Sequence, residues 1–285
     1  MGGNILISLI VHESYESINN FIEILNITNK NNYLIIHVNK SWTDFDFKNI
    51  NNTNNNVFIN ENRFYLKNKY SGKSGIHISN LEYANSINLD YEFVILSTSN
   101  QFFTKPVDFK YLIEKKYGSD FLCIESKFEE YKKISHHDKD FIKSQFSNYN
   151  KEMSEIGKNN GVFGGPHEGI FFTKEISIKI IETYRKYFNN NINLFRCDEE
   201  VIIHTILYNI VKPTETESLC FFMYRGESIE NFKKFIDQKM SEEYKQKYKT
   251  YFTKNINKSI LKKISIKPIN RVDINLQKEL IDYVK

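Results

Sequence analysis

Short apolar runs alternate with amphipathic stretches through the first half of the chain. Residues 93–96 are a continuous apolar run, and 4–12 and 33–38 are largely apolar, each of the length typical of a buried strand. Between them, residues 17–25 and 75–87 repeat apolar positions at helical spacing. This alternation predicts an α/β fold, with a mostly parallel sheet flanked by helices.

The second half of the chain is less regular. A helix is predicted over 174–188, and another begins near Asp198. The polar stretch 125–160 predicts helical segments or a lid. Further short strands are predicted at 57–59, 64–66, 121–124, 169–173 and 219–224.

The 285 residues are enough for one large α/β domain with an extension. We expect a catalytic domain over 1–225 and a basic, helical C-terminal extension over 226–285 that packs on it. The net charge of +4 is small for this length and does not indicate a nucleic-acid partner. Three cysteines are too few for a disulfide framework, and the start lacks the features of a secretory signal, so we expect a cytoplasmic protein.

The apolar run 93–96 breaks into Ser97-Thr98-Ser99-Asn100. In open α/β sheets, ligands bind at the carboxyl ends of the strands. A site built around a divalent cation would carry paired carboxylates there, whereas this edge carries hydroxyls and an amide. We therefore expect no metal at this edge.

Asp44-Phe45-Asp46 is an Asp-x-Asp sequence. It opens an Asn-rich loop after the second predicted strand, where paired carboxylates are mostly solvated. A metal site at Asp44 and Asp46 remains the minor alternative.

Ser71-Gly72-Lys73-Ser74 has part of a phosphate-loop sequence. The full motif needs a glycine five residues before the Gly-Lys pair, and position 67 is Lys. The segment instead predicts a turn followed by a helix N-terminus, whose backbone amides could face a ligand.

Asp198-Glu199-Glu200 precedes an apolar helical stretch, and two interpretations stay open. Asp198 can be an N-cap with two acids in the first turn, an arrangement that the helix dipole favours. Alternatively, one of the carboxylates is a general base that faces a cleft.

The segment 254–271 carries Lys and Arg but no acidic residue. It can be a solvated face, a clamp for a diphosphate, or a contact with an anionic membrane surface. His12 and His37 lie in predicted strands and are expected to be structural. His136-His137-Asp138 lacks a spaced third ligand, so no metal is expected there.

Several of these segments, within 4–210 and in the same order, resemble the core-2/I-branching β-1,6-N-acetylglucosaminyltransferase family, which includes protein xylosyltransferases. Residues 35–40 are similar to its Ile-His-Val-Asp-Lys element, with Asn39 for Asp. The other similar segments are the strand ending at His12, YSGKSGIHISNLEYA (70–84), ILSTSNQFF (95–103), GGPHEGIFFTKE (164–175) and EEVIIHTIL (199–207).

The resemblance implies a glycosyltransferase-A fold and an inverting, metal-independent transfer from a UDP-sugar. The family places its catalytic Glu five residues before a Thr, and alignment on Thr205 implies Glu200 as the base, with Glu199 as the alternative. Arg225 and Lys254 are the implied diphosphate ligands. The remaining implied nucleotide-sugar ligands are Val11, His12, Asn39, Tyr70, Lys73, Ser74, Ser97 and Asn100. The implied acceptor contacts are Glu125, Phe102 and Glu168.

We therefore expect an enzyme that moves a sugar, GlcNAc or else xylose or a related sugar, to a glycan hydroxyl in surface polysaccharide or lipooligosaccharide synthesis. The expected partners are the UDP-sugar and the glycan, with no cofactor, no metal and no nucleic acid. The basic segment could bring the protein to the inner face of the membrane. The alternatives are a non-catalytic carbohydrate- or nucleotide-binding relative and a metal-dependent glycosyltransferase that uses Asp44 and Asp46.

Overall fold

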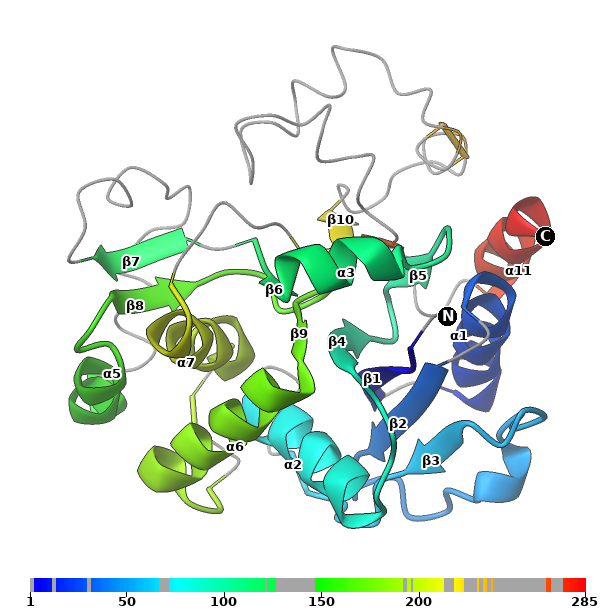
Figure 1. The fold of residues 1–285 in the computed structure, drawn as a ribbon. Helices are drawn as coiled ribbons and strands as arrows, with labels where there is room; N and C mark the ends of the chain where they lie inside the picture. Colours follow the sequence, from blue (N-terminus) through cyan, green and yellow to red (C-terminus); the bar gives the residue numbers. More distant parts are fainter. Residues whose placement is uncertain are drawn as a thin grey trace.

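A six-stranded sheet forms the centre of the molecule (Figure 1). The computed structural model describes residues 3–11, 14–29, 32–66, 72–120, 122–126, 147–191, 194–195, 197–212, 218–222, 230, 233–234, 237, 265–267 and 274–285. In spatial order the strands are β3 (Val57–Ile59), β2 (Asn32–Val38), β1 (Ile5–Val11), β4 (Phe93–Thr98), β9 (Phe171–Thr173) and β6 (Tyr117–Gly118).

The first four strands of this order run parallel. β1 pairs with β2 on one side and β4 on the other, so that Ile10 lies opposite both His37 and Thr98. β3 continues the parallel set beyond β2, whereas β9 runs antiparallel to β4 and to β6. The carboxyl ends of β1, β2 and β4 therefore meet at one edge of the sheet, where ligands bind in open α/β folds.

Helices cover both faces of the sheet. Figure 1 shows α1 (Tyr15–Thr28) beside α11 (Ile274–Val284), on the side away from α2 (Lys73–Ser86) and α6 (Lys174–Phe188). α1 and α11 are joined by a buried hydrogen bond of 3.0 Å from Asn20 Nδ2 to Gln277 Oε1.

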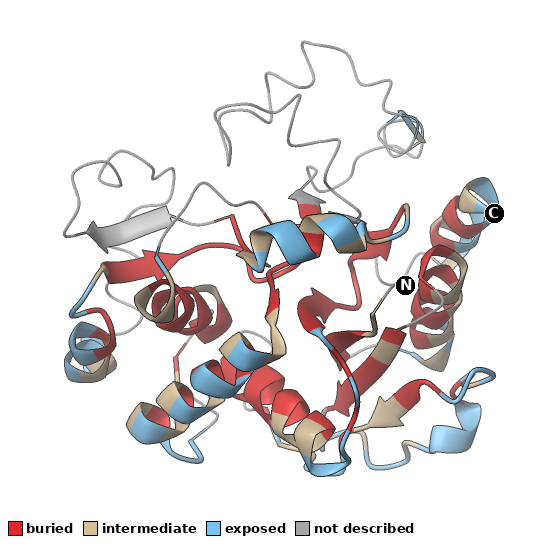
Figure 2. Ribbon diagram, in the orientation of Figure 1, coloured by how far each residue is buried: buried red, intermediate tan, exposed pale blue. Residues whose placement is uncertain are grey.

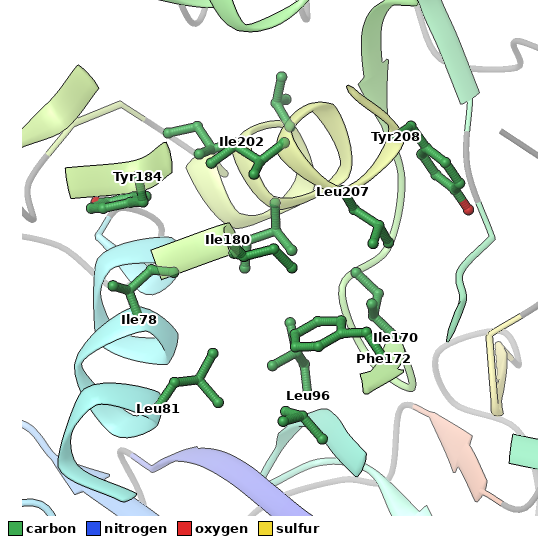
Figure 3. Close-up of a cluster of buried hydrophobic side chains, with 14 of the residues drawn as sticks. Ile78, Leu81, Leu96, Ile170, Phe172, Ile180, Tyr184, Ile202, Leu207 and Tyr208 are labelled. Atoms are coloured by element: carbon green, nitrogen blue, oxygen red, sulfur yellow. The ribbon is translucent and has the colours of Figure 1, made fainter. Parts of the chain in front are cut away.

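The second face is covered by α2, α6 and α7 (Ile202–Ile210), which pack on β4 and β9 (Figure 3). Apolar side chains from all five elements form one buried cluster, which includes Ile78, Leu81, Leu96, Phe172, Ile180, Tyr184, Ile202 and Leu207. Burial of this kind contributes roughly 1.5–3 kcal/mol for each large apolar side chain.

The alternation of side chains along β1 explains why this strand has no polar face. Ile5, Ile7, Leu9 and Val11 contribute to the cluster beneath α1, whereas Leu6 contributes to the cluster beneath α2. Both faces are covered, so β1 is buried along its whole length (Figure 2), as is typical of parallel strands.

Two smaller sheets extend this core. β10 (Cys220–Phe222) pairs in parallel with β11 (Ser265–Lys267), which pairs antiparallel with β5 (Phe102–Phe103). β7 (Leu122–Ser126) pairs antiparallel with β8 (Gly161–Gly164). Shorter elements connect these strands and helices, among them α3 (Phe109–Lys115), α5 (Asn150–Ile156) and two 3-10 turns, η1 (Phe47–Asn49) and η4 (Asp198–Glu200).

The predicted α/β class is confirmed, and the mostly parallel sheet with helices on both faces is consistent with a glycosyltransferase-A-like fold. The helix predicted over 174–188 coincides with α6. The strand predicted at 64–66 is wrong: Phe64 N donates to His37 Nε2 and its carbonyl accepts from Lys40 N, so it joins no ladder.

The described C-terminal residues include the strand β11 as well as the helix α11, so this part of the chain is not helical throughout. Within the described residues, no helix is both long and apolar enough to cross a membrane.

Candidate functional site

The candidate site lies at the edge where β1, β2 and β4 end. Val11 closes β1 and pairs with Val38 of β2, and both are buried. Asn39 follows β2 directly and its Oδ1 accepts from Ser41 N at 3.1 Å, which closes a turn at the strand end. At the end of β4, Thr98 Oγ1 donates to Asn100 Oδ1 at 2.7 Å.

Ser97 lies deeper in β4 and is fully buried, with its hydroxyl bonded to Gln101 Oε1 at 2.9 Å. Asn100 is at the margin of burial. Of the two, Asn100 is thus the better placed to meet a ligand at this edge, and the nucleotide-binding roles of both stay predictions.

Helix α2 begins beside this edge, as the turn-and-helix interpretation of 71–74 predicted. Gly72 precedes the helix with φ of +83°, a left-handed conformation that glycine adopts without strain. Gly72 also has no side chain with which to cap α2, so the cap must come from elsewhere.

The missing cap comes from Asp198, in the distant turn η4. Its Oδ1 accepts from the backbone N of Lys73 at 3.1 Å, and its Oδ2 accepts from Ser74 Oγ at 2.5 Å. The prediction that Asp198 caps its own helix is therefore wrong. η4 ends at Glu200, α7 begins at Ile202, and the Asp198 side chain points to α2 instead.

A buried ion pair ties the same two segments together. Lys73 Nζ lies 2.8 Å from Glu199 Oε1, with the side chains 16% and 1% exposed. Burial by itself lowers the pKa of Lys73, but the charge and hydrogen bond of Glu199, with the charges of Glu168 and Glu200, raise it above its usual value. Lys73 is thus a fixed ammonium group near the edge of the sheet, with Glu199 as its partner.

The pKa of Asp198 is shifted in the direction that favours the neutral acid. Burial and the neighbouring Glu199 charge raise the pKa of Asp198 well above its usual range, and the hydrogen bond with Glu199 acts in the same direction. These effects favour the neutral acid. A proton on Asp198 removes one buried charge, and Lys73 balances the charge of Glu199. The interior therefore holds no uncompensated charge from these two acids.

Glu200 is the only one of these three acids that is not fully buried. Its backbone is held on both sides, since its N donates to Cys197 O at 3.0 Å and its O accepts from Gly165 N at 2.7 Å. Cys197 enters the turn with φ of +56°, an uncommon conformation for a residue other than glycine. The backbone of the turn is thus tightly specified around Glu200.

The loop between β8 and β9 adds a buried histidine and a third buried acid. His167 Nε2 lies 3.6 Å from Glu168 Oε1, and His167 Nδ1 lies 4.0 Å from Glu199 Oε1. Glu168 Oε1 also accepts from Thr98 Oγ1 at 3.4 Å. These contacts connect the end of β4 to the acidic turn through side chains that are all buried.

Gly169 allows this loop to approach the backbone at Cys220 closely. Its φ is +76°, and a Cβ there would lie only 2.5 Å from Cys220 N. Only glycine fits this close approach, which fixes where Glu168 enters the cluster.

Two further predicted site residues belong to the smaller sheets. Phe102 is buried in β5, within the core beneath α1, and the backbone of Glu125 lies in β7. Four of the predicted ligands lie outside the described residues: His12, Tyr70, Arg225 and Lys254. The histidine pair His136 and His137 also lies outside them.

Asp44 and Asp46 are both exposed. Asp46 Oδ1 accepts from Lys48 N at 2.9 Å and so caps the turn η1, while the carbonyl of Asp44 accepts from the Tyr15 hydroxyl at 3.3 Å. Within the described ranges, no three His, Cys, Asp or Glu side chains gather in a way that could hold a metal ion.

Three buried histidines at or near the site were missed by sequence reasoning: His77, His167 and His204. His77, on α2, contacts Ser8 Oγ through Nδ1 at 2.8 Å, and its ring lies 5.3 Å from that of His167. His204 is buried on α7. The available signal was Ser8, a polar residue in an otherwise apolar strand, which requires a polar partner in the covering helix.

Two of these histidines predict a loss of stability in mild acid. Burial is the main cause that lowers the pKa of His77 to about 3 and that of His204 to about 4. In the unfolded chain both take up a proton below pH 6.5, whereas the folded protein does not. Stability is therefore retained above pH 6.5 and lost as the pH falls, by about 2 kcal/mol for each histidine at pH 5.

Urea unfolding at pH 7.5 and pH 5.0 measures this loss. His77→Gln should reduce the difference between the two pH values by about 2 kcal/mol, whatever its own stability. An unchanged difference in the variant would show that His77 is not the group that titrates.

Comparisons with known proteins add little to this geometry. No protein-family model matches the chain, and no curated protein matches its sequence. A solved structure described as the apo form of the WbbM bifunctional glycosyltransferase aligns with 99% of this chain and 50% of its own, at 12% identity and a TM-score of 0.44. The chain thus spans about half the length of that structure, and a likeness at this level does not bear on its activity.

Proposed function

We propose that the chain is an inverting glycosyltransferase that moves a sugar from a UDP-sugar to a hydroxyl group without a metal ion. The observation that carries the proposal is that Glu200, a partly exposed acid, lies close enough to Lys73 for its charge to help raise the Lys73 pKa, while the Lys73 ammonium is fixed by the adjacent Glu199 near the carboxyl edge of the sheet. Such a site offers a proton acceptor and a positive charge, and the transfer needs both.

Glu200 is the proposed base. The acceptor hydroxyl attacks the anomeric carbon and its proton passes to the Glu200 carboxylate, a form of catalysis that contributes roughly 100- to 10,000-fold. The bond from the anomeric carbon to the UDP oxygen breaks as the new bond forms on the opposite face, so the anomeric configuration inverts. Glu199 suits this role less well because it is buried and paired with Lys73.

Lys73 is the proposed internal countercharge for the diphosphate. The leaving UDP develops negative charge, which a fixed ammonium in a protected site stabilises as a cation would. The N-terminus of α2 adds the favourable end of the helix dipole. Arg225 and Lys254, implied by the resemblance, remain proposed further ligands of the diphosphate.

The finer assignments follow the resemblance to the core-2/I-branching family. We propose GlcNAc, or else xylose or a related sugar, as the transferred group, and a glycan of surface polysaccharide or lipooligosaccharide as the acceptor. Asn39 at the end of β2 and Asn100 at the end of β4 lie at the edge where the donor would bind. Glu168 remains an acceptor contact proposed from the resemblance; its side chain is buried beside Thr98 at the end of β4.

Removal of divalent metal tests the proposed chemistry. Because Lys73 supplies the positive charge, titration of the protein with UDP and with a panel of UDP-sugars should give the same affinities with and without EDTA, and turnover should survive chelation. Activity that disappears in EDTA and returns with manganese would contradict the proposal and would favour a site at Asp44 and Asp46.

A further inference from the structure

The turn that carries Glu200 is fastened to helix α2 by a residue outside the proposed chemistry. Asp198 and Ser74 are 124 residues apart in sequence, yet the Asp198 carboxyl bonds to both the Ser74 hydroxyl and the Lys73 amide. Asp198 is completely buried, and so is Ser74. A side chain with no exposure does not contact substrate from this position.

Resting on the proposed function, we propose that Asp198 is a positioning residue, which fastens the Glu200 turn to the first turn of α2 and so sets the Glu200 carboxylate for proton abstraction. Asp198 lies two residues before Glu200, within a turn closed by the bonds from Glu200 N to Cys197 O and from Val201 N to Asp198 O. Movement of Asp198 therefore moves the backbone of Glu200.

Other described contacts also hold this turn. The described backbone bond from Gly165 N to Glu200 O joins it to the β8–β9 loop, and the pair of Lys73 with Glu199 joins it to α2 through a long, flexible side chain. Asp198 connects the turn to α2 directly, through one hydrogen bond to each of its two carboxyl oxygens. Loss of these bonds removes the direct connection between the Asp198 carboxyl and the first turn of α2.

The connection between the turn and α2 is important because a general base must be held at a defined position. A proton acceptor must lie within hydrogen-bond reach of the reacting hydroxyl, and a displacement of about 1 Å costs roughly 100-fold in rate. A residue that only stabilises the fold would lower the melting temperature and leave the turnover of the folded enzyme unchanged. Turnover below the melting temperature therefore separates the two roles.

The experiment compares three variants of the full chain. Asp198→Ala removes both bonds. Asp198→Asn keeps an oxygen for the Lys73 amide and a polar group for Ser74. Ile281→Ala, in the buried face of α11 against α1, is the control that lowers stability away from the site. Each is measured by hydrogen exchange of the amides at 73–76 and 198–202, and by UDP release and UDP affinity.

In Asp198→Ala we expect faster exchange in both segments, a fall in kcat of about 10- to 100-fold, and a change in UDP affinity of less than about threefold. Asp198→Asn should recover most of the lost kcat, and Ile281→Ala should lower the melting temperature alone. The proposal fails if exchange in Asp198→Ala is unchanged, or if exchange rises while kcat stays normal. A wild-type chain that consumes no UDP-sugar would refute the proposed function by itself, and the exchange result would still decide whether Asp198 fastens the turn.

Discussion

Replacement of Glu200 by glutamine is expected to lower the rate of sugar transfer by at least about 100-fold, within the usual range for loss of a general base. Glutamine keeps the size of the side chain and the backbone of η4 but cannot accept the proton of the acceptor hydroxyl. The UDP affinity and the melting temperature should change little, since Glu200 is only partly buried and its backbone bonds remain. Steady-state kinetics and UDP titration measure both quantities.

Glu199→Gln is the matched comparison, because the two acids are adjacent in the same turn. Its effect on transfer should be milder, while its effect on stability should be larger, since Glu199 holds the buried Lys73. Normal turnover in Glu200→Gln together with lost turnover in Glu199→Gln would place the base one residue earlier. Normal turnover in both variants would show that neither acid is the base and that both are structural.

Replacement of Lys73 by methionine is expected to destabilise the protein by about 3–5 kcal/mol, the cost of leaving a buried charge without its partner. The affected charge is Glu199, whose side chain is 1% exposed and whose Oε1 lies 2.8 Å from Lys73 Nζ. The same variant should weaken the binding of UDP much more than that of uridine, because uridine has no diphosphate. Urea unfolding and isothermal titration measure the two effects.

Two further variants test the cause. Lys115→Met removes a partner of the exposed Glu114, at the same 2.8 Å separation, and should cost at most about 1 kcal/mol. The double variant Lys73→Met/Glu199→Gln removes both charges of the buried pair and should recover part of the lost stability. A single-variant loss no larger than that of Lys115→Met would mean that Glu199 is not held by Lys73.

The central strands and helices could be predicted from sequence because burial leaves a recognisable apolar pattern in each of them. β1, β2 and β4 are covered on both faces, so they appear as largely apolar runs. The segment 64–66 has the same apolar character but bonds to a histidine side chain and a single strand end. Apolar character does not distinguish these two environments, and the strand prediction failed there.

The candidate site could be predicted only in part. The acids at 198–200 and the helix start at Lys73 were recognised as separate features, but their contact depends on how the turn η4 packs on α2, from which it is separated by 124 residues of chain. Asp198 has the local signature of an N-cap, and only the tertiary fold shows that it caps another helix. His77 and His204 were missed because a helical pattern does not show which polar residue faces a buried strand.

The stereochemistry of UDP-sugar consumption tests the central claim most directly. The chain is incubated with each of a panel of α-linked UDP-sugars, and the anomeric proton of the sugar released to water or to an acceptor is followed by NMR. We expect UDP release from at least one donor in the presence of EDTA, with the first-formed product in the β configuration and with release abolished in Glu200→Gln. A first-formed α product, or the absence of binding and release with every UDP-sugar, would contradict the central claim.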